Sequence, residues 1–257
     1  MKISGNTMLI TGGTSGIGRA LAEAFHAEGN QVIVAGRRQA MLDEVTQANP
    51  GIKSVVLDVE DAAAIKRSAA KLLKDFPALN VVVHNAGIMR SETLTKGELA
   101  DAEAIIATNL LGPIRLTAAL LPALLKQKQA TIMTVTSGLA FVPLALTPSY
   151  SASKAAIHSY TQAMRYQLKD TPVQVIELAP PYVQTDLQGP RQAADPTAMP
   201  LKDFIAEAMA LLKSSPDATE ILVERVKAQR FAEASGSYDA FFKMMNERVI
   251  AARKDWH

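Results

Sequence analysis

Three side chains in the middle of the chain can pass one proton to or from a carbonyl oxygen. Tyr150 and Lys154 are four residues apart in a segment of helical spacing, so they share one helix face. Ser137 precedes Tyr150 by thirteen residues, and its hydroxyl can donate to an oxygen on which negative charge develops. Because an ammonium favours the phenolate, we expect Lys154 to lower the pKa of Tyr150 and make it a general acid and base.

A glycine-rich turn near the amino terminus can hold a diphosphate. Gly12, Gly16 and Gly18 lie between an expected strand and a helix that begins near Gly16. Missing side chains permit a tight turn and close backbone approach, and the N-terminus of a helix favours an anion. The spacing T-G-x-x-x-G-x-G lacks the Gly-Lys-Ser/Thr ending of a nucleoside-triphosphatase loop. A purely structural turn is the alternative reading.

Short β-branched runs alternate with longer segments of helical period along the chain. This alternation predicts an α/β protein, a single Rossmann-type domain over residues 1–257 with a doubly wound parallel sheet of about six strands. The expected strands are residues 7–10, 31–35, 54–57, 81–84, 131–136 and 173–178. The expected helices between them are residues 16–28, 39–47, 62–74, 98–126 and 149–168.

The pattern changes after the sixth expected strand. A loop rich in Pro, Gly, Gln and Asp leads into helical spacing at residues 201–212, and we interpret residues 185–213 as a helical substrate lid. Two further helices are expected within residues 216–253, at 218–233 and 238–252. A seventh strand is not predicted.

Composition excludes several classes of protein. The 257 residues carry a net charge of +2 from 27 basic and 25 acidic side chains, which gives no indication of nucleic-acid binding. Cysteine is absent, and four scattered histidines form no metal-ligand pattern, so no metal site is expected. The amino terminus lacks a signal-peptide pattern, and no apolar run of about 20 residues is recognised, so we expect a cytoplasmic protein without a membrane span.

From about residue 7 to residue 185, the chain resembles the short-chain dehydrogenase/reductase family. The resemblance depends on the glycine turn, Ser137, the Tyr-x-x-x-Lys pair and two further motifs, His84-Asn85-Ala86-Gly87 and Asn109-Leu110-Leu111-Gly112. It implies that Lys154 also binds the nicotinamide ribose and that Asn109 holds a water that completes a proton relay. A cationic nicotinamide ring near Tyr150 would, like Lys154, favour the phenolate and lower its pKa. His84 replaces the usual Asn, and we interpret it as a packed, hydrogen-bonded residue without a chemical role.

The end of the second expected strand indicates which nicotinamide cofactor is used. Arg37 and Arg38 follow that strand, where no carboxylate is available for a ribose 2′-hydroxyl, and Arg37 can hold a 2′-phosphate. We therefore predict NADP(H) in preference to NAD(H), with an additional contact from Ser15; a solvated helix start is the other explanation of the two arginines. The resemblance also implies that Asp58 and Val59 contact the adenine, although Asp58 fits a helix cap equally well.

The complete expected site follows from the turn, the proton-transfer group and the resemblance. The expected catalytic residues are Asn109, Ser137, Tyr150 and Lys154. The expected cofactor-binding residues are Gly12, Thr14, Ser15, Gly16, Ile17, Gly18, Arg37, Arg38, Asp58, Val59, Asn85, Ala86, Gly87, Tyr150, Lys154, Pro180, Val183 and Thr185. The expected substrate contacts are Ser137, Tyr150 and Tyr182, with a hinge under the lid as the other role for Tyr182.

Two departures from the family bear on assembly and subgroup. Pro180-Pro181 stands where Pro-Gly is usual, which predicts a stiffer or rerouted loop. The absence of a seventh strand favours a homodimer, with a tetramer as the alternative. In both features the chain resembles a subgroup of reductases associated with teichoic-acid D-alanylation operons (DltE-like).

Taken together, the sequence predicts an NADP-dependent oxidoreductase of a small carbonyl or secondary alcohol, with Tyr150 as the general acid and base. The alternative is a non-catalytic NADP-binding sensor or scaffold that retains this fold.

Overall fold

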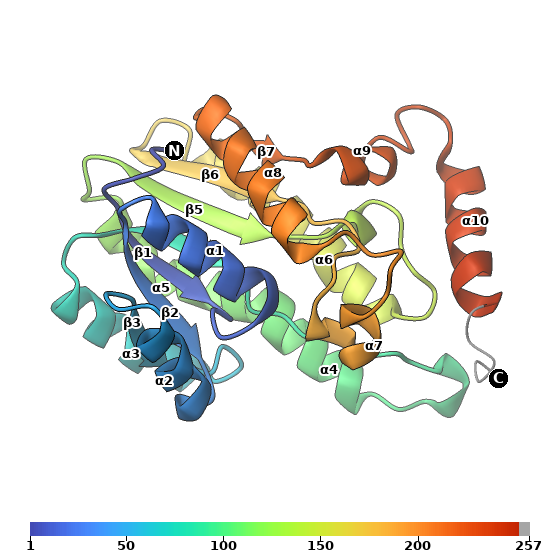
Figure 1. Cartoon of the computed structure of the whole chain (residues 1–257), viewed down its shortest axis with the longest axis horizontal. Helices are drawn as coiled ribbons and strands as arrows, with labels where there is room; N and C mark the ends of the chain where they lie inside the picture. Colours follow the sequence, from blue (N-terminus) through green and yellow to red (C-terminus); the bar gives the residue numbers. More distant parts are fainter. Residues whose placement is uncertain (252–257) are drawn as a thin grey trace.

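A parallel β-sheet of seven strands forms the centre of the molecule (Figure 1). The computed structural model describes residues 1–251. The strands are β1 (Thr7–Thr11), β2 (Gln31–Gly36), β3 (Lys53–Val56), β4 (Leu79–His84), β5 (Ala130–Val135), β6 (Val173–Leu178) and β7 (Glu220–Ile221). Their spatial order is β3-β2-β1-β4-β5-β6-β7. The six predicted strands are therefore confirmed, with small shifts at their ends.

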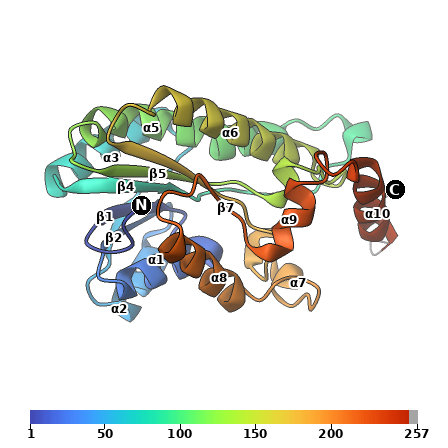
Figure 2. The same cartoon turned by 90° about the horizontal axis from the view of Figure 1, so that it is seen from above.

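Helices cover both faces of the sheet because its central strands are apolar on both sides. Figure 2 shows α1 (Gly16–Ala27), α2 (Gln39–Ala48) and α8 (Leu201–Ser214) on one face. On the other face lie α3 (Ala62–Asp75), α5 (Gly112–Leu124) and α6 (Pro148–Gln167). Each face has its own apolar core: Phe25 and Phe204 are fully buried in the first, and Leu116 and Leu120 in the second. The doubly wound arrangement is as predicted.

The strand order reverses between β1 and β4, which places a crevice at their carboxyl ends. β1 pairs with β2 on one side and with β4 on the other, all in parallel. The connection from β1 passes to one face of the sheet and the connection from β4 to the other, so the chain separates at this edge. Ligands of open α/β sheets bind at such a switch point.

The carboxyl-terminal region differs from the prediction. The helix expected at residues 218–233 is wrong: the chain there forms β7, followed by the shorter α9 (Glu224–Arg230). Pairing with β6 overrides helical spacing, because Glu177 N–H donates to Thr219 O and Ala179 N–H donates to Ile221 O. A seventh strand therefore exists. The prediction of a homodimer, which depended on the absence of this strand, loses that support. The last helix is α10 (Tyr238–Ala251), and residues 252 and 253 of the predicted segment lie outside the described residues.

The helix expected at residues 98–126 is interrupted. It begins as α4 (Ala100–Ile106), passes through a π-helical turn, η2 (Ala107–Leu111), and continues as α5. Taken together, Ala100–Leu124 is the one helical segment among the described residues that is long and apolar enough, by length and composition, to cross a membrane. No such segment was expected from the sequence. The buried leucines of α5 pack against the sheet, and the core helix of a folded domain meets the same test.

Candidate active site

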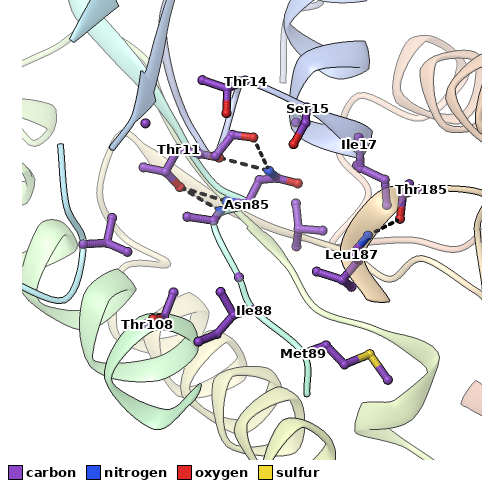
Figure 3. A pocket seen from close by; sticks show the side chains of 18 of the residues that line it. Thr11, Thr14, Ser15, Ile17, Asn85, Ile88, Met89, Thr108, Thr185 and Leu187 are labelled. Carbon is purple, nitrogen blue, oxygen red and sulfur yellow. Dashed lines mark hydrogen bonds between the residues drawn. The ribbon is translucent and has the colours of Figure 1, made fainter. Parts of the chain in front are cut away.

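The cleft at the switch point encloses about 420 Å³. Figure 3 shows Asn85 at its centre, facing Thr11, with Ile17 and Thr185 to one side. Nearly all the residues that the sequence predicts for the site line this cleft. They are Gly12, Thr14, Ser15, Gly16, Ile17, Gly18, Arg37, Arg38, Asp58, Val59, Asn85, Ala86, Gly87, Ser137, Tyr150, Lys154, Pro180, Val183 and Thr185. Asn109 and Tyr182 do not line it.

The glycine turn is shaped by contacts that leave no room for side chains. Gly12 adopts a φ of +65° and Gly16 a φ of +52°, a region that favours glycine. A Cβ on Gly18 would lie 2.2 Å from both Gly12 O and Asn85 Nδ2. The Asn85 amide donates to Thr11 O at 3.0 Å and to Gly12 O at 3.2 Å, which fixes the turn to the end of β4.

The amino terminus of α1 lines the same cleft and can receive an anion. Within the described chain, the Ser15 side chain makes no capping hydrogen bond to this helix. The first backbone N–H groups of α1 therefore lack the usual side-chain partner, and the helix dipole adds positive potential there. A turn with glycine at residues 12, 13 and 16 and an uncapped helix start together fit the diphosphate of a dinucleotide.

Arg37 lies at the far end of the cleft, beside a carboxylate that the sequence analysis did not consider. Its guanidinium is 3.7 Å from Glu60 Oε1, and its side chain is 58% exposed. Glu60 also accepts a hydrogen bond of 2.6 Å from Thr108 Oγ1. Glu60 could not be recognised from sequence spacing, because it follows β3 and meets Arg37 only in the folded chain. With more than half of its side chain exposed, Arg37 retains donors for a further anion.

Asp58 and Val59 follow β3 at the same end of the cleft. The Asp58 carboxylate accepts a hydrogen bond from the backbone N–H of Glu60, whereas Asp61 caps α3 by accepting from Ala63 N and Ala64 N. The interpretation of Asp58 as a helix cap is therefore wrong. Asp58 lines the cleft, where its carboxylate can contact a ligand.

Tyr150 and Lys154 lie on one face of α6, next to Ser137 at the end of β5. All three are buried, with exposed fractions of 6%, 5% and 8%. Lys154 Nζ lies 5.6 Å from the centre of the Tyr150 ring and donates to Val135 O at 2.8 Å. Tyr150 is hydrogen-bonded to Ser137, whose Oγ also accepts from Leu139 N–H. The structure thus brings the three residues together.

Burial dominates the ionisation of this group. It raises the pKa of Tyr150 to about 12, although the hydrogen bond with Ser137 acts in the opposite direction. Burial also lowers the pKa of Lys154 to about 8, partly offset by the negative charge of Glu177. In the protein alone, burial therefore raises the pKa of Tyr150 above its usual value. The lowering expected beside Lys154 and a bound cationic nicotinamide stays a prediction.

Asn109 lies in the π-helical turn, behind the cleft rather than in its wall. Its Oδ1 accepts from Ile88 N–H at 2.9 Å, and its Nδ2 donates to Ile88 O and to Ser153 Oγ, both at 3.0 Å. A Cβ on Gly87 would be 3.3 Å from Asn109 Oδ1 and 3.7 Å from Lys154 Nζ. Asn109 therefore anchors the chain after β4 close to Lys154, while the water that it is expected to hold stays a prediction.

His84 is a packed residue, as the sequence analysis interpreted it. It is 4% exposed, and its Nε2 is 2.8 Å from Thr117 Oγ1. Burial lowers its pKa to about 4, so the ring is neutral near pH 7. A neutral His84 ring cannot act as a cationic group at the cleft.

The segment after β6 closes one side of the cleft. Pro180 and Pro181 both line it, and Pro180 O accepts a hydrogen bond of 2.8 Å from Gly138 N–H. Thr185 packs beside the glycine turn, since a Cβ on Gly16 would be 3.5 Å from its side chain. Tyr182 is 44% exposed, and its hydroxyl donates to Asp195 Oδ2 at 3.2 Å. That contact supports the hinge interpretation of Tyr182 over a substrate contact.

Several residues of the cleft escaped the sequence analysis. Ile88 and Met89 follow the Asn-Ala-Gly turn, and Leu187 and Gln192 come from the segment after Thr185 (Figure 3 labels all of these except Gln192). The Gln192 amide donates to Val183 O at 2.8 Å and to Thr185 Oγ1 at 3.2 Å. The only sequence feature that could have indicated these four residues is that they lie close to predicted site residues along the chain. Their side-chain types do not point to a particular chemistry.

Comparison with known proteins identifies relatives along nearly the whole chain. The family model described as short chain dehydrogenase matches residues 6–196. The uncharacterized oxidoreductase DltE of Bacillus subtilis (strain 168) is 41% identical over 251 residues, 96% of this chain and 98% of that protein. Dehydrogenase/reductase SDR family member 7B of Bos taurus is 27% identical over 97% of this chain and 83% of its own.

Solved structures share the fold. A serine dehydrogenase complexed with NADP+ has a TM-score of 0.75 at 28% identity, covering 83% of this chain and 91% of its own. A short chain dehydrogenase from Burkholderia cenocepacia J2315 in complex with NADP has a TM-score of 0.80 at 24% identity, covering 94% and 99%.

Proposed function

Because the chain belongs to the short-chain dehydrogenase/reductase family, we propose that it is an NADP-dependent oxidoreductase of a small carbonyl or secondary alcohol, with Tyr150 as the general acid and base. One observation carries this proposal. Ser137, Tyr150 and Lys154 lie in contact at the same cleft as the glycine turn and the amino terminus of α1. A proton-transfer group and an anion cradle in one cleft are what a nicotinamide-dependent reaction requires.

The residues of this chain can hold each part of the dinucleotide. The glycine turn and the start of α1 would bind the diphosphate, Arg37 the 2′-phosphate, and Lys154 the nicotinamide ribose. Two observations support NADP. Arg37 is largely exposed at the end of β2, and two structures with the same fold were solved with NADP. When bound, the nicotinamide supplies or accepts the hydride.

The protein supplies proton transfer and orientation. In reduction, the Tyr150 hydroxyl donates its proton to the substrate oxygen while the Ser137 hydroxyl donates a hydrogen bond to the same oxygen. In oxidation, the Tyr150 phenolate takes the proton of the alcohol. Lys154 stabilises the phenolate that reduction leaves behind, and because the site is buried this charge interaction is stronger than in water.

The high pKa of Tyr150 keeps its phenol protonated near neutral pH, which is the form that donates the proton in reduction. A phenol with a pKa of about 12 is fully protonated there and ready to donate. Oxidation would need additional positive charge close to the phenol, which an oxidised nicotinamide ring provides.

Tyr150→Phe tests the catalytic assignment. We expect kcat for NADPH-dependent reduction of an accepted ketone to fall by about 10²–10⁴-fold, because the proton donor is lost while the ring stays. NADPH binding, followed by its fluorescence, should stay within about threefold of wild type. A variant that turns over as fast as wild type would refute the role of Tyr150. A wild type that binds NADPH but reduces no carbonyl in a broad panel would favour the non-catalytic sensor.

Further proposals concern the lid, assembly and location. We propose that residues 185–213 act as a lid, supported by the contact of Thr185 with the glycine turn. We propose that the protein associates through α4, α5 and α6, the helices at which the family resemblance implies one interface. It would form a homodimer through these helices alone, or a tetramer if β7 provides a second interface. Light scattering after size-exclusion chromatography separates these states. A cytoplasmic location and the absence of a membrane span stay predictions.

A further inference from the structure

A carboxylate from the loop after β4 caps the helix that carries Tyr150. Glu92 Oε1 accepts a hydrogen bond of 3.0 Å from the backbone N–H of Ser149, and its Oε2 accepts one of 2.7 Å from Ser149 Oγ. The Glu92 backbone N–H also donates to Leu146 O at 3.0 Å. These three hydrogen bonds fix Glu92 to the start of α6, at the residue that precedes Tyr150.

The start of α6 lacks the cap that its own residues would normally provide. Thr147 is at the cap position, but its side chain makes no capping hydrogen bond, and within residues 1–251 its buried Oγ1 has no hydrogen-bond partner. Pro148, the first residue of the helix, has no N–H to donate. Glu92, which lies 57 residues before Ser149 in the chain, therefore supplies the cap, and its negative charge faces the positive end of the helix dipole.

The segment that ends at Glu92 is fastened to α6 at a second place. The segment begins at Ile88, whose backbone N–H and O are both hydrogen-bonded to the Asn109 side chain. Asn109 Nδ2 also donates to Ser153 Oγ at 3.0 Å, and Ser153 Oγ donates to Tyr150 O at 2.7 Å. Residues 88–92 therefore hold the first turns of α6 on both sides of Tyr150.

We propose that Glu92 is a positioning residue that, through Ser149, holds the Tyr150 hydroxyl in the place that proton transfer requires. The proposal rests on the proposed function, because the position of the hydroxyl matters only if Tyr150 exchanges a proton with the substrate. A displacement of about 1 Å at a reacting group can slow a reaction by about 10²-fold. Glu92 does not line the cleft, so its effect on the reaction passes through α6.

A double-mutant cycle with Tyr150→Phe tests the proposal. Glu92→Ala removes both acceptors of Ser149, and we expect kcat for NADPH-dependent ketone reduction to fall at least about tenfold, because the Tyr150 hydroxyl is no longer held in place. In the Tyr150→Phe background, the same change should lower kcat by less than about twofold, because no hydroxyl remains to be positioned. A cap that only stabilises the fold would lower kcat equally in both backgrounds. Equal losses would therefore overturn the proposal, as would an unchanged kcat in Glu92→Ala.

Two further variants separate the hydrogen bonds from other effects of the substitution. Glu92→Gln keeps an acceptor oxygen for the Ser149 N–H and should retain kcat within about threefold of wild type. Glu98→Ala, at an exposed position of the same loop, should leave kcat unchanged. The Kd for NADPH, measured by fluorescence, should stay within about threefold of wild type in all three variants, because neither glutamate lines the cleft. A loss in Glu92→Gln as large as that in Glu92→Ala would overturn the role of these hydrogen bonds.

A last measurement does not depend on turnover. ¹⁹F NMR of the protein labelled with fluorotyrosine reports the surroundings of each tyrosine ring, and Tyr150→Phe assigns the signal of Tyr150. We expect Glu92→Ala to move this signal and Glu98→Ala to leave it in place. An unmoved signal in folded Glu92→Ala would overturn the proposal. If the wild type reduces no carbonyl but the signal moves, the proposed function fails while the hold of Glu92 on Tyr150 stands.

Discussion

Lys154 should make the protein less stable than it would be without this charge. Burial lowers the pKa of Lys154 from 10.5 to about 8 in the folded protein. Below pH 8 both the folded and the unfolded chain carry the proton, and the folded state is destabilised by the full difference between the two pKa values, about 3 kcal/mol. As the pH rises through 8 toward 10.5, the folded state loses the proton first and the destabilisation disappears.

Lys154→Met removes this ionisation while keeping a side chain of similar length. From the same two pKa values, the destabilisation is about 3 kcal/mol at pH 7 and about 2 kcal/mol at pH 9. The variant loses the hydrogen bond from Nζ to Val135 O, which contributes about 1 kcal/mol. We therefore expect Lys154→Met to be more stable than wild type by about 2 kcal/mol at pH 7 and by about 1 kcal/mol at pH 9, with its activity lost.

Urea unfolding at the two pH values measures this difference by linear extrapolation. Because every other titrating group is common to the two proteins, the change in their difference between pH 7 and pH 9 isolates Lys154. Lys128→Met, at an exposed position, is the matched control and should change the free energy of unfolding by less than about 0.5 kcal/mol at either pH. A variant that is no more stable than wild type at pH 7, or whose advantage is the same at both pH values, would refute the reasoning.

Three further predictions concern the cleft and its support. Gly18→Ala should abolish NADPH binding measured by fluorescence and destabilise the fold by about 1–3 kcal/mol in urea unfolding, because its Cβ would meet Gly12 O and Asn85 Nδ2 at 2.2 Å; tight binding by the variant would contradict this. Arg37→Ala should raise the Kd for NADPH at least about tenfold and change that for NADH less than about twofold, since a charge-assisted contact to the 2′-phosphate contributes about 1.5–3 kcal/mol; equal losses would contradict the NADP assignment. The folded pKa of His84 lies at about 4, below its usual 6.5, so its contribution to stability should be retained above about pH 6.5 and decrease by about 2–3 kcal/mol on acidification to pH 4.5. In His84→Gln, this loss should be absent from the urea unfolding series.

The part of the fold that local pattern determines could be predicted from the sequence. Continuous apolar runs such as β4 and β5 are buried on both faces in any doubly wound sheet, so their existence follows from composition. β7 could not be predicted in this way. Its two residues, Glu220 and Ile221, form a strand only because the edge of β6 offers backbone partners, and their own spacing favours a helix.

The candidate site shows the same division. The glycine turn and the Tyr-Lys pair are local patterns, and the structure places both in the cleft. The raised pKa of Tyr150 in the protein alone could not be predicted, since sequence spacing identifies a neighbouring ammonium but not how deeply the phenol is buried. Glu92 was missed for a related reason. It lies 57 residues before Ser149, and the two meet only when the loop after β4 packs against α6.

The π-helical turn at Ala107–Leu111 sets the position of Asn109 relative to Gly112, which follows the turn. This position therefore depends on the number of residues in the turn. A π turn bonds each N–H to a carbonyl five residues back, so it accommodates one residue more than an α-helix of the same length. Deleting one residue there would allow a continuous α-helix in which α4 keeps its orientation relative to Gly112, which packs on Val59. A homologue with an unbroken helix should therefore align with a one-residue gap in this turn, and its equivalent of Asn109 would have to come from a different position.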